Sequence, residues 1–419
     1  MEAVLSAPKL SAAPIRAAAP GRSPLPSRVV ALTPASSAAR ARPLRSGPKV
    51  RLPFSALFIS PASSAPFSEE KLCTAQPTWP DPFDLGLHPS LLGSNTVQAL
   101  ARDEMLGAAE PAQWEDAAAS QGVRIRRHRR PTASMRAIEE AMGAPRNILE
   151  KIIWDKEIEV AEGLARNPLK EVIESAVKAP PTRDFYGALA AAYKRNGVPA
   201  LIAEVKKASP SRGVIRENFD PVEIAQAYEK HGAACLSILT DEKYFQGSFE
   251  NLRKVRKAGV KCPLLCKEFV IDEWQIYYAR SIGADAVLLI AAVLTDMDLK
   301  YLLRICKELG LTALIEVHDE NEMERVLRID DVQLIGINNR SLETFIVDTS
   351  NTKTLLEKHG NAIRQKGILV VGESGLFNPD DVAYVQNAGV SAVLVGESLV
   401  KQEDPGRAIA GLFGKELLH

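Results

Sequence analysis

Lysine and glutamate side chains stand at the ends of several apolar segments from residue 200 onward. They are Glu204, Lys206, Lys267, Glu316 and Glu373. A charge in such a place usually marks only the point where a strand reaches water. If these groups converged on one site, their opposite charges would shift one another's pKa values, as acid–base catalysis at neutral pH requires. The chemistry therefore depends on a fold that brings them together.

The alternation of side chains along a strand decides which of these groups can share a site. In the segment 200–207, the period of two puts Glu204 and Lys206 on one face and Val205 on the other. If Val205 packs against covering helices, Glu204 and Lys206 face the interior of the fold. The same argument directs Glu316 inward.

The tetrapeptide Val-Gly-Glu-Ser occurs twice near the C-terminus, in LVVGESG (369–375) and in LVGESL (394–399). Glycine lets backbone N–H groups approach an anion closely, and the loops after two neighbouring barrel strands commonly hold a phosphate. We therefore expect a phosphate site on Ser374, Gly375 and Gly396.

Two more residues are candidates to complete the phosphate site. They are Arg340 and Ser209, and Ser209 lies in the basic loop KKASPSRG (206–213), which we expect to fold over the site as a lid. Glu397 lies beside the expected phosphate and would repel it, so we expect its side chain to point away.

Eight apolar segments of β type follow one another from residue 200 onward. They are 200–207, 234–241, 264–270, 286–291, 312–317, 334–340, 368–374 and 392–398. Helical patterns separate them, and near-continuous apolar strands between helices indicate parallel strands covered by helices. Eight such units predict an α/β fold, a (β/α)8 TIM barrel, over about 200–415. An open doubly wound sheet is the alternative, but no G-x-G-x-x-G follows the first strand.

Regions ahead of the barrel differ in composition. Three helices are expected at 147–165, 168–179 and 183–197, as an extension that either caps the barrel or packs against its outside. Residues 69–146 are expected to be a low-order connector, whose basic run RIRRHRRP we interpret as a solvated tether. Residues 1–68 are expected to be a disordered transit peptide, because they are rich in Ser, Ala, Pro and Arg and poor in acids. The composition of this leader favours a plastid over a mitochondrion.

Bulk composition argues against several classes of function. The leader holds nine Lys or Arg and one acid, so the remainder carries 43 basic and 51 acidic residues, which argues against nucleic acid as the main partner. No apolar run approaches the ~20 residues that cross a bilayer. The five cysteines match no zinc or disulfide pattern and indicate a reducing compartment. We expect no metal site, and we interpret His318, two residues beyond Glu316, as an ordinary loop residue.

Five motifs in order resemble the indole-3-glycerol phosphate synthase family, in its plant form. They are LIAEVKKASPSRG (201–213), LLCKEF (264–269), LIEVHD (314–319), IGINNR (335–340) and VVGESG (370–375). The resemblance covers roughly 147–415. It implies conversion of 1-(2-carboxyphenylamino)-1-deoxyribulose 5-phosphate to indole-3-glycerol phosphate, with loss of carbon dioxide and water. It also implies a chloroplast enzyme of tryptophan biosynthesis that needs no cofactor, and it leaves room for a downstream partner of the tryptophan synthase type.

The resemblance also implies a role for each site residue. Lys267 corresponds to the general acid, and Glu316 and Lys206, with Glu204 beside it, correspond to the groups that transfer protons and remove water. Asn338 and Glu373 correspond to contacts with the anthranilate part and the sugar hydroxyls. Ser209, Arg340, Gly375 and Gly396 correspond to phosphate contacts, with Ser374 on the same wall. The helix 147–165 corresponds to one that closes over the site.

Two other functions remain open at this stage. One is a different phosphate-binding barrel, such as phosphoribosylanthranilate isomerase, although the set of Lys206, Lys267 and Glu316 argues against it. The other is a barrel without catalytic activity that binds a partner in the pathway. That function predicts the loss of a catalytic residue, and none is missing from the motifs.

Overall fold

The structure is a computed structural model that describes residues 111–127 and 143–418 of the 419-residue chain. These residues belong to one compact unit. The predicted leader (1–68) and most of the predicted connector (69–146) lie outside the described residues, as does Cys73. Within the described ranges, no helix has the length and apolar character that crossing a membrane requires.

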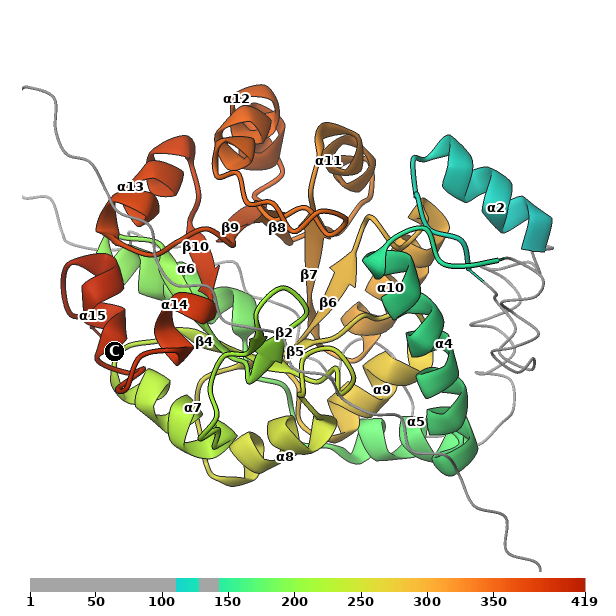
Figure 1. Ribbon diagram of the computed structural model, residues 1–419, viewed down its shortest axis with the longest axis horizontal. Helices are drawn as coiled ribbons and strands as arrows, with labels where there is room; N and C mark the ends of the chain where they lie inside the picture. The colour runs from blue at the N-terminus through green and yellow to red at the C-terminus, as the bar shows by residue number, and fades with distance from the viewer. Residues whose placement is uncertain (1–110, 128–142, 419) are drawn as a thin grey trace, which may run out of the picture. The chain divides into compact units, whose positions relative to one another are not determined.

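Eight parallel strands close into a barrel, as Figure 1 shows. In chain order they are β1 (Ala200–Val205), β4 (Cys235–Leu239), β5 (Leu264–Lys267), β6 (Ala286–Ile290), β7 (Thr312–Val317), β8 (Leu334–Asn338), β9 (Leu369–Glu373) and β10 (Ala392–Val395). Strand β1 closes the ring, because Ile202 pairs with Cys235 on one side and with Leu394 on the other. The predicted (β/α)8 TIM barrel is confirmed, and the doubly wound alternative is wrong.

Helices surround the barrel. They are α7 (Pro221–Lys230), α8 (Phe249–Lys257), α9 (Glu273–Ser281), α10 (Asp296–Glu308), α11 (Glu320–Leu327), α12 (Ser350–Gln365), α13 (Pro379–Ala388), α14 (Glu397–Val400) and α15 (Ala408–Phe413). Local sequence fixes where several begin. Asp220 accepts hydrogen bonds from the first turn of α7, and Asn378 forms a capping box with Asp381 at the start of α13.

Strand register places the polar strand ends at one rim of the barrel. Ile290 of β6 pairs with Glu316 of β7, and Asn338 of β8 pairs with Glu373 of β9. Lys267 is the last residue of β5. Because parallel strands all point the same way, these C-terminal residues share one end of the barrel.

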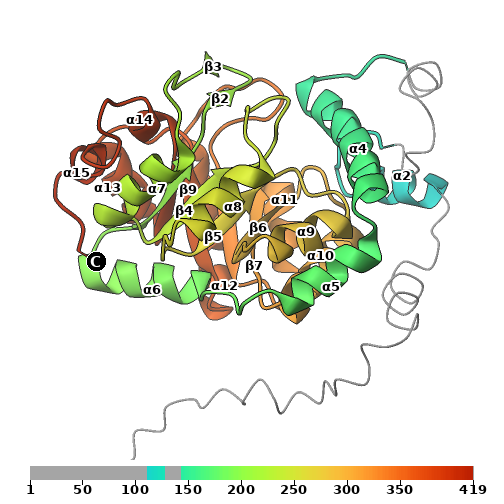
Figure 2. The ribbon, with the colours of Figure 1, turned by 90° about the horizontal axis from the view of Figure 1, so that it is seen from below.

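A small hairpin follows β1 at that same end. Its strands are β2 (Ala208–Ser209) and β3 (Gly213–Val214), which lie in the predicted lid 206–213 and extend it by one residue, and we call residues 206–214 the lid loop. Figure 2 shows the hairpin on the opposite side of the barrel from α6. Just beyond the lid loop, Arg216 Nη1 donates to the backbone oxygens of Val400, at 2.9 Å, and Gln402, at 2.7 Å, which anchors the end of the loop.

Three helices lead directly into the barrel, as predicted. They are α4 (Ile148–Arg166), α5 (Leu169–Lys178) and α6 (Phe185–Asn196). Helix α6 lies against the N-terminal ends of the strands, where the Cys235 thiol donates to the Phe185 backbone oxygen at 3.6 Å. It therefore closes the bottom of the barrel, away from the lid loop. Helix α5 packs along α9.

Residues 111–127 are packed, which corrects the expectation of a low-order connector and a solvated basic run in this part of the chain. Helix α2 (Pro111–Ser120) places Trp114 Nε1 2.8 Å from Asp298 Oδ2 of α10. In the basic run, Arg126 Nη2 lies 2.7 Å from Glu150 Oε2 of α4. The acids that hold this segment lie on other helices, so composition alone does not reveal the packing.

Lys156 of α4 is buried and ties this helix to the C-terminal rim of the barrel. Its Nζ lies 2.9 Å from Asp241 Oδ2, after β4, and 2.8 Å from Glu268 Oε1, after β5. Glu159 Oε2 is also 2.8 Å away. Burial lowers the pKa of Lys156, but the charges of Glu268, Asp241 and Glu159 outweigh burial and raise it. The rim and α4 therefore depend on one buried cation.

Lys156→Met is expected to lower the free energy of unfolding by about 3–5 kcal/mol, because it leaves Asp241 and Glu268 buried without their cation. Lys151→Met is the matched control, since the exposed Lys151 lies on the same helix and pairs with Asp155 at 3.5 Å. The control is expected to change stability by less than about 1 kcal/mol. Urea unfolding of the full chain measures both, and equal effects would contradict the buried clamp.

Candidate active site

A cavity lies at the C-terminal ends of the strands, beside the lid loop. Its walls include all eleven residues that the sequence singles out: Glu204, Lys206, Ser209, Lys267, Glu316, Asn338, Arg340, Glu373, Ser374, Gly375 and Gly396. The predicted convergence of these residues on one rim is therefore present. Helix α4, which we expected to close over the site, contributes no residue to the cavity wall and lies beside it.

The ammonium group of Lys267 lies between two carboxylates from different strands. Its Nζ is 3.0 Å from Glu316 Oε2 and 2.7 Å from Glu373 Oε2. Burial lowers the pKa of Lys267, but the charges of Glu316 and Glu373 outweigh burial and raise it. Lys267 therefore carries its proton at neutral pH.

Glu316 makes contacts that favour its ionised form. Its Oε1 accepts a hydrogen bond from Asn338 Nδ2 at 3.2 Å and lies 3.1 Å from His318 Nε2. Burial raises the pKa of Glu316, but Lys267 and His318 outweigh burial and lower it. Glu316 is thus a carboxylate at neutral pH, able to accept a proton.

Glu373 differs from Glu316, although both contact Lys267. Burial raises the pKa of Glu373, Lys267 lowers it, and the nearby charges of Glu316 and Glu204 raise it again, so that the net shift is upward. Its Oε1 is buried and makes no hydrogen bond with any described group. Of the two carboxylates on Lys267, Glu373 is the one that takes up a proton more readily.

His318 lies in the loop between β7 and α11, as predicted, and its side chain packs against the site. Its Nε2 faces Glu316, and its Nδ1 lies 3.1 Å from Glu322 Oε2 of α11. Burial lowers the pKa of the imidazole, but the two carboxylates outweigh burial and raise it to about 10. The spacing of four residues between His318 and Glu322, across a strand-to-helix turn, is the sequence signal that could have revealed this pair.

Asn338 is held in one orientation by its neighbours. Its Oδ1 accepts from Ser374 Oγ at 2.9 Å and from the Arg340 backbone N–H at 3.0 Å, so its Nδ2 is directed to Glu316. Ser374 adopts the left-handed backbone region with φ 66°, and Gly375 follows with φ 80°. A Cβ at Gly375 would also lie 2.7 Å from Thr349 Cγ2, so this turn requires glycine.

Lys206 and Glu204 form a second pair on β1 and in the lid loop, with Nζ 2.5 Å from Glu204 Oε1. Gly396, on the neighbouring strand end, makes room for this pair. A Cβ added at Gly396 would lie 2.3 Å from Glu204 Oε1. The glycine that the sequence analysis associated with phosphate therefore also has a packing reason.

Glu397 lines the cavity, which corrects the expectation that its side chain points away. Its Oε1 lies 3.3 Å from Arg212 Nε of the lid loop, and its Oε2 lies 3.9 Å from Arg340 Nη2. Two arginines therefore offset the charge that would otherwise repel an anion. The expectation considered only the sign of Glu397 and not these partners.

The cavity has an extensive apolar lining from several strands and loops, and motif reasoning missed it. It consists of Leu239, Phe245, Phe269, Leu288, Ile290, Leu342, Phe345, Leu376, Phe377 and Leu394, with Val395 beside them. Such a lining suits an aromatic ring next to charged groups. Phe269, two residues after Lys267, is the member that strand-end reasoning could have found.

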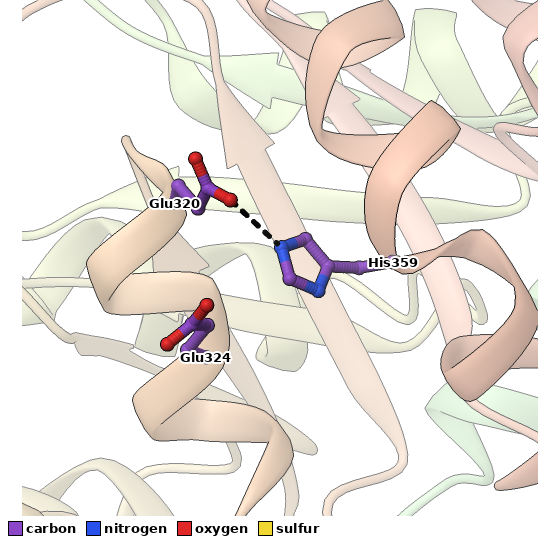
Figure 3. Close-up of side chains that lie close together, drawn as sticks. All are labelled: Glu320, Glu324 and His359. Atoms are coloured by element: carbon purple, nitrogen blue, oxygen red, sulfur yellow. Dashed lines mark ion pairs between the residues drawn. The ribbon is translucent and has the colours of Figure 1, made fainter.

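Glu320, Glu324 and His359 form a separate cluster on the outside of the barrel, between α11 and α12, as Figure 3 shows. Their ligand atoms come within 4.8 Å of one another. The carboxylates already have cations, because Lys358 lies 2.6 Å from Glu320 and Arg328 lies 3.1 Å from Glu324. We interpret this cluster as a surface ion-pair network.

A (β/α)8 barrel with paired lysines and glutamates at its C-terminal rim belongs to the class of barrel enzymes that work by acid–base chemistry. Comparison with known proteins narrows this class. The family model for indole-3-glycerol phosphate synthase matches residues 149–412. The chain belongs to the indole-3-glycerol phosphate synthase family, which confirms the resemblance found in the sequence.

Individual relatives agree with the family match. The chain is 65% identical over 315 residues to the chloroplastic indole-3-glycerol phosphate synthase of Arabidopsis thaliana. This match covers 73% of the chain and 78% of the relative. It is 56% identical over 292 residues to the synthase of Microcystis aeruginosa, in a match that covers 69% of this chain and 97% of the relative. It is 59% identical over 272 residues to the synthase of Rippkaea orientalis, in a match that covers 65% of this chain and 92% of the relative.

Gly336→Ala and Gly396→Ala are expected to lower kcat/KM in a synthase assay by on the order of 100-fold, because misplaced catalytic groups cost about that much. The new Cβ would lie 2.2 Å from Glu373 Oε1 in the first variant and 2.3 Å from Glu204 Oε1 in the second. Gly372→Ala is the control, since its nearest neighbour would be 3.5 Å away. Unchanged kcat/KM in both test variants would show that these carboxylates need no fixed position.

Proposed function

We propose that this chain is an indole-3-glycerol phosphate synthase, which closes the indole ring of 1-(2-carboxyphenylamino)-1-deoxyribulose 5-phosphate and releases carbon dioxide and water. Family membership supports this reaction and makes the chain a carboxy-lyase of tryptophan biosynthesis. We assign the chemistry to this cavity because Lys267 Nζ lies within 3.0 Å of two carboxylates. The reaction needs an acid and a base side by side, and these groups provide both.

Lys267 acts as the general acid of ring closure. It protonates the carbonyl oxygen of the substrate while the ring carbon that bears the carboxylate attacks the carbonyl carbon. Carbon dioxide then leaves, and the ring becomes aromatic again. The apolar lining around Phe245 and Phe269 holds the aromatic part of the substrate.

Substrate binding has to make Lys267 a better proton donor. An ammonium held by two carboxylates has a raised pKa, and so it gives up its proton reluctantly. The Oε1 of Glu373 has no hydrogen-bond partner among the described residues, which suits it to accept hydrogen bonds from the sugar hydroxyls. When Glu373 binds the substrate or takes up a proton, Lys267 loses part of the negative charge that holds its proton.

Glu316 and Lys206 handle the dehydration that completes the indole. Glu316, as a carboxylate, removes a proton from the new five-membered ring, and Lys206 protonates the departing hydroxyl, which leaves as water. Two protons are donated and one is removed in the whole sequence. Each turnover therefore takes up one proton from solvent.

The phosphate of the substrate binds at Ser209, Arg340, Ser374, Gly375 and Gly396. Arg340 supplies the cation, and the sharp turn at Ser374 and Gly375 brings backbone close to the anion. Arg212, 3.3 Å from Glu397, and Arg340, 3.9 Å from it, offset the charge of this carboxylate, so that it opposes the phosphate less.

The same proposal extends to where the protein acts. The leader 1–68 has the composition of a transit peptide, and the Arabidopsis relative is named chloroplastic. Import into plastids followed by action in the stroma fits both observations.

Lys267→Met is expected to lower kcat by about 100- to 10,000-fold, which is the usual contribution of a general acid. Substrate affinity should stay within about tenfold, because the phosphate site is unchanged. Formation of the indole product, followed by its fluorescence, measures turnover, and quenching of the chain's own fluorescence measures binding. Lys307→Met, which alters an exposed lysine that pairs with Asp331, is the control. Normal turnover by Lys267→Met would refute the assigned role.

Arg340→Met is expected to raise KM by about 10- to 100-fold and leave kcat within about threefold, because it removes a charge-assisted hydrogen bond to the phosphate. Competitive inhibition by inorganic phosphate should weaken in parallel with the rise in KM. The matched control is Arg328→Met, whose arginine is exposed and pairs with Glu324 at 3.1 Å. A lower kcat with unchanged KM would place the phosphate elsewhere.

A further inference from the structure

His318 joins the cavity to a carboxylate outside it. Its Nε2 lies 3.1 Å from Glu316 Oε1, and its Nδ1 lies 3.1 Å from Glu322 Oε2. The Nε2 contact lacks hydrogen-bond alignment, so it acts chiefly through charge. The imidazole lines a neighbouring hollow and not the wall of the cavity around Lys267, so it does not touch the substrate.

We propose that His318 is a positioning residue for the reaction, which, as an imidazolium held by Glu322, keeps the Glu316 carboxylate ionised and correctly turned. This inference rests on the proposed function, because it deepens the role given to Glu316. It assigns Glu322 the task of orienting the imidazole from α11. Neither His318 nor Glu322 belongs to the motif residues with a role in catalysis.

The two carboxylates require a charged imidazole between them. A neutral imidazole carries a single N–H, so one of Glu316 and Glu322 would face a lone pair. Only the cation carries a proton on the nitrogen nearest each carboxylate, and toward Glu316 it acts through its charge. The raised pKa of His318, about 10, agrees with this geometry.

The backbone around His318 is fixed independently of the imidazole. The His318 N–H donates to Glu322 Oε2 at 2.7 Å, and the His318 carbonyl accepts from Asn351 Nδ2 of α12 at 2.9 Å. Asp319 caps α11 by accepting from the Glu322 N–H at 2.9 Å. Glu322 is therefore held in place before it binds the ring, and the imidazole has little freedom.

Loss of His318 would change both the charge and the orientation of Glu316. The charged groups that face the imidazole are Glu316 from β7 and Glu322 from α11, with Lys267 from β5 on the far oxygen of Glu316. Asp319 lies on the same turn and is 4.0 Å from Arg124. Without the imidazolium, the amide of Asn338 is the one contact that Glu316 Oε1 keeps among the residues that the structure describes. The carboxylate would then bind a proton more readily and turn more freely.

The test compares His318→Gln with wild type in the full chain. We expect kcat to fall about 10- to 100-fold, because the substitution displaces the Glu316 carboxylate. KM should stay within about threefold, because the groups that bind the substrate keep their positions. The acidic limb of the kcat/KM pH profile should move up by about one unit, since a neutral amide does not stabilise the carboxylate. Glu322→Gln should also lower kcat, because the imidazole is less firmly oriented, but it should not move this limb up, since an imidazole beside Glu316 stays protonated in the acidic range.

His359→Gln is the matched control. His359 lies on α12, where its Nε2 is 3.8 Å from the exposed Glu320, and its loss should alter neither kcat nor the pH profile. A His318→Gln pH profile that coincides with the wild-type profile would overturn the proposal. Absence of indole product from the wild type would instead refute the proposed function.

A measurement without turnover covers the case in which the variant fails to fold. Imidazole nitrogen signals in NMR spectra of 15N-histidine-labelled wild type report the protonation of each of the six histidines. At pH 8 the His318 ring, assigned by its absence in His318→Gln or by its coupling to neighbouring protons, should be doubly protonated. A neutral His318 ring at that pH would overturn the proposal.

Discussion

The contact between one buried ammonium and two buried carboxylates is the interaction on which the site depends. Lys267 comes from the third strand of the barrel, Glu316 from the fifth and Glu373 from the seventh, while Glu204 comes from the first and Lys206 directly follows that strand. Alternate strands of such a barrel direct their side chains into the same layer, so these charges meet only if the ring closes. Burial would penalise each charge alone, but together they compensate one another. Closure therefore gives the residues their chemistry.

The two carboxylates on Lys267 illustrate how environment separates chemically identical groups. Glu316 receives an amide from Asn338 and a cation from His318, whereas Glu373 has an oxygen above Gly336 with no hydrogen-bond partner among the described residues and feels the charges of its neighbours. Their pKa values consequently move in opposite directions, downward for Glu316 and upward for Glu373. A permanent base and an exchangeable acid thus flank one proton donor, which is the division of labour that acid–base catalysis uses.

Periodic patterns in the sequence predicted most of the fold and of the candidate site. The remainder depends on contacts between residues far apart in the sequence. The segment 312–317 coincides with β7, and the eleven site residues meet in one cavity because strand parity and closure are regular. The segment 264–270 runs past β5, since Glu268 leaves the ladder to bind Lys156. Such partners lie on helices remote in sequence. The packing of 111–127 and the side-chain direction of Glu397 also depend on residues remote in sequence, so motif and period could not reveal them, whereas the contact between His318 and Glu322 has a local signal in its spacing of four residues.

Protonation of the central cluster is what the whole account requires, and neutron diffraction from a deuterium-exchanged crystal at neutral pH observes it directly. The account predicts three deuterons on Lys267 Nζ and none on either oxygen of Glu316. It also predicts that any shared proton in the cluster resides on Glu373. A neutral Lys267 amine, or a deuteron on Glu316 with Glu373 ionised, would contradict the assignment of acid and base in this barrel.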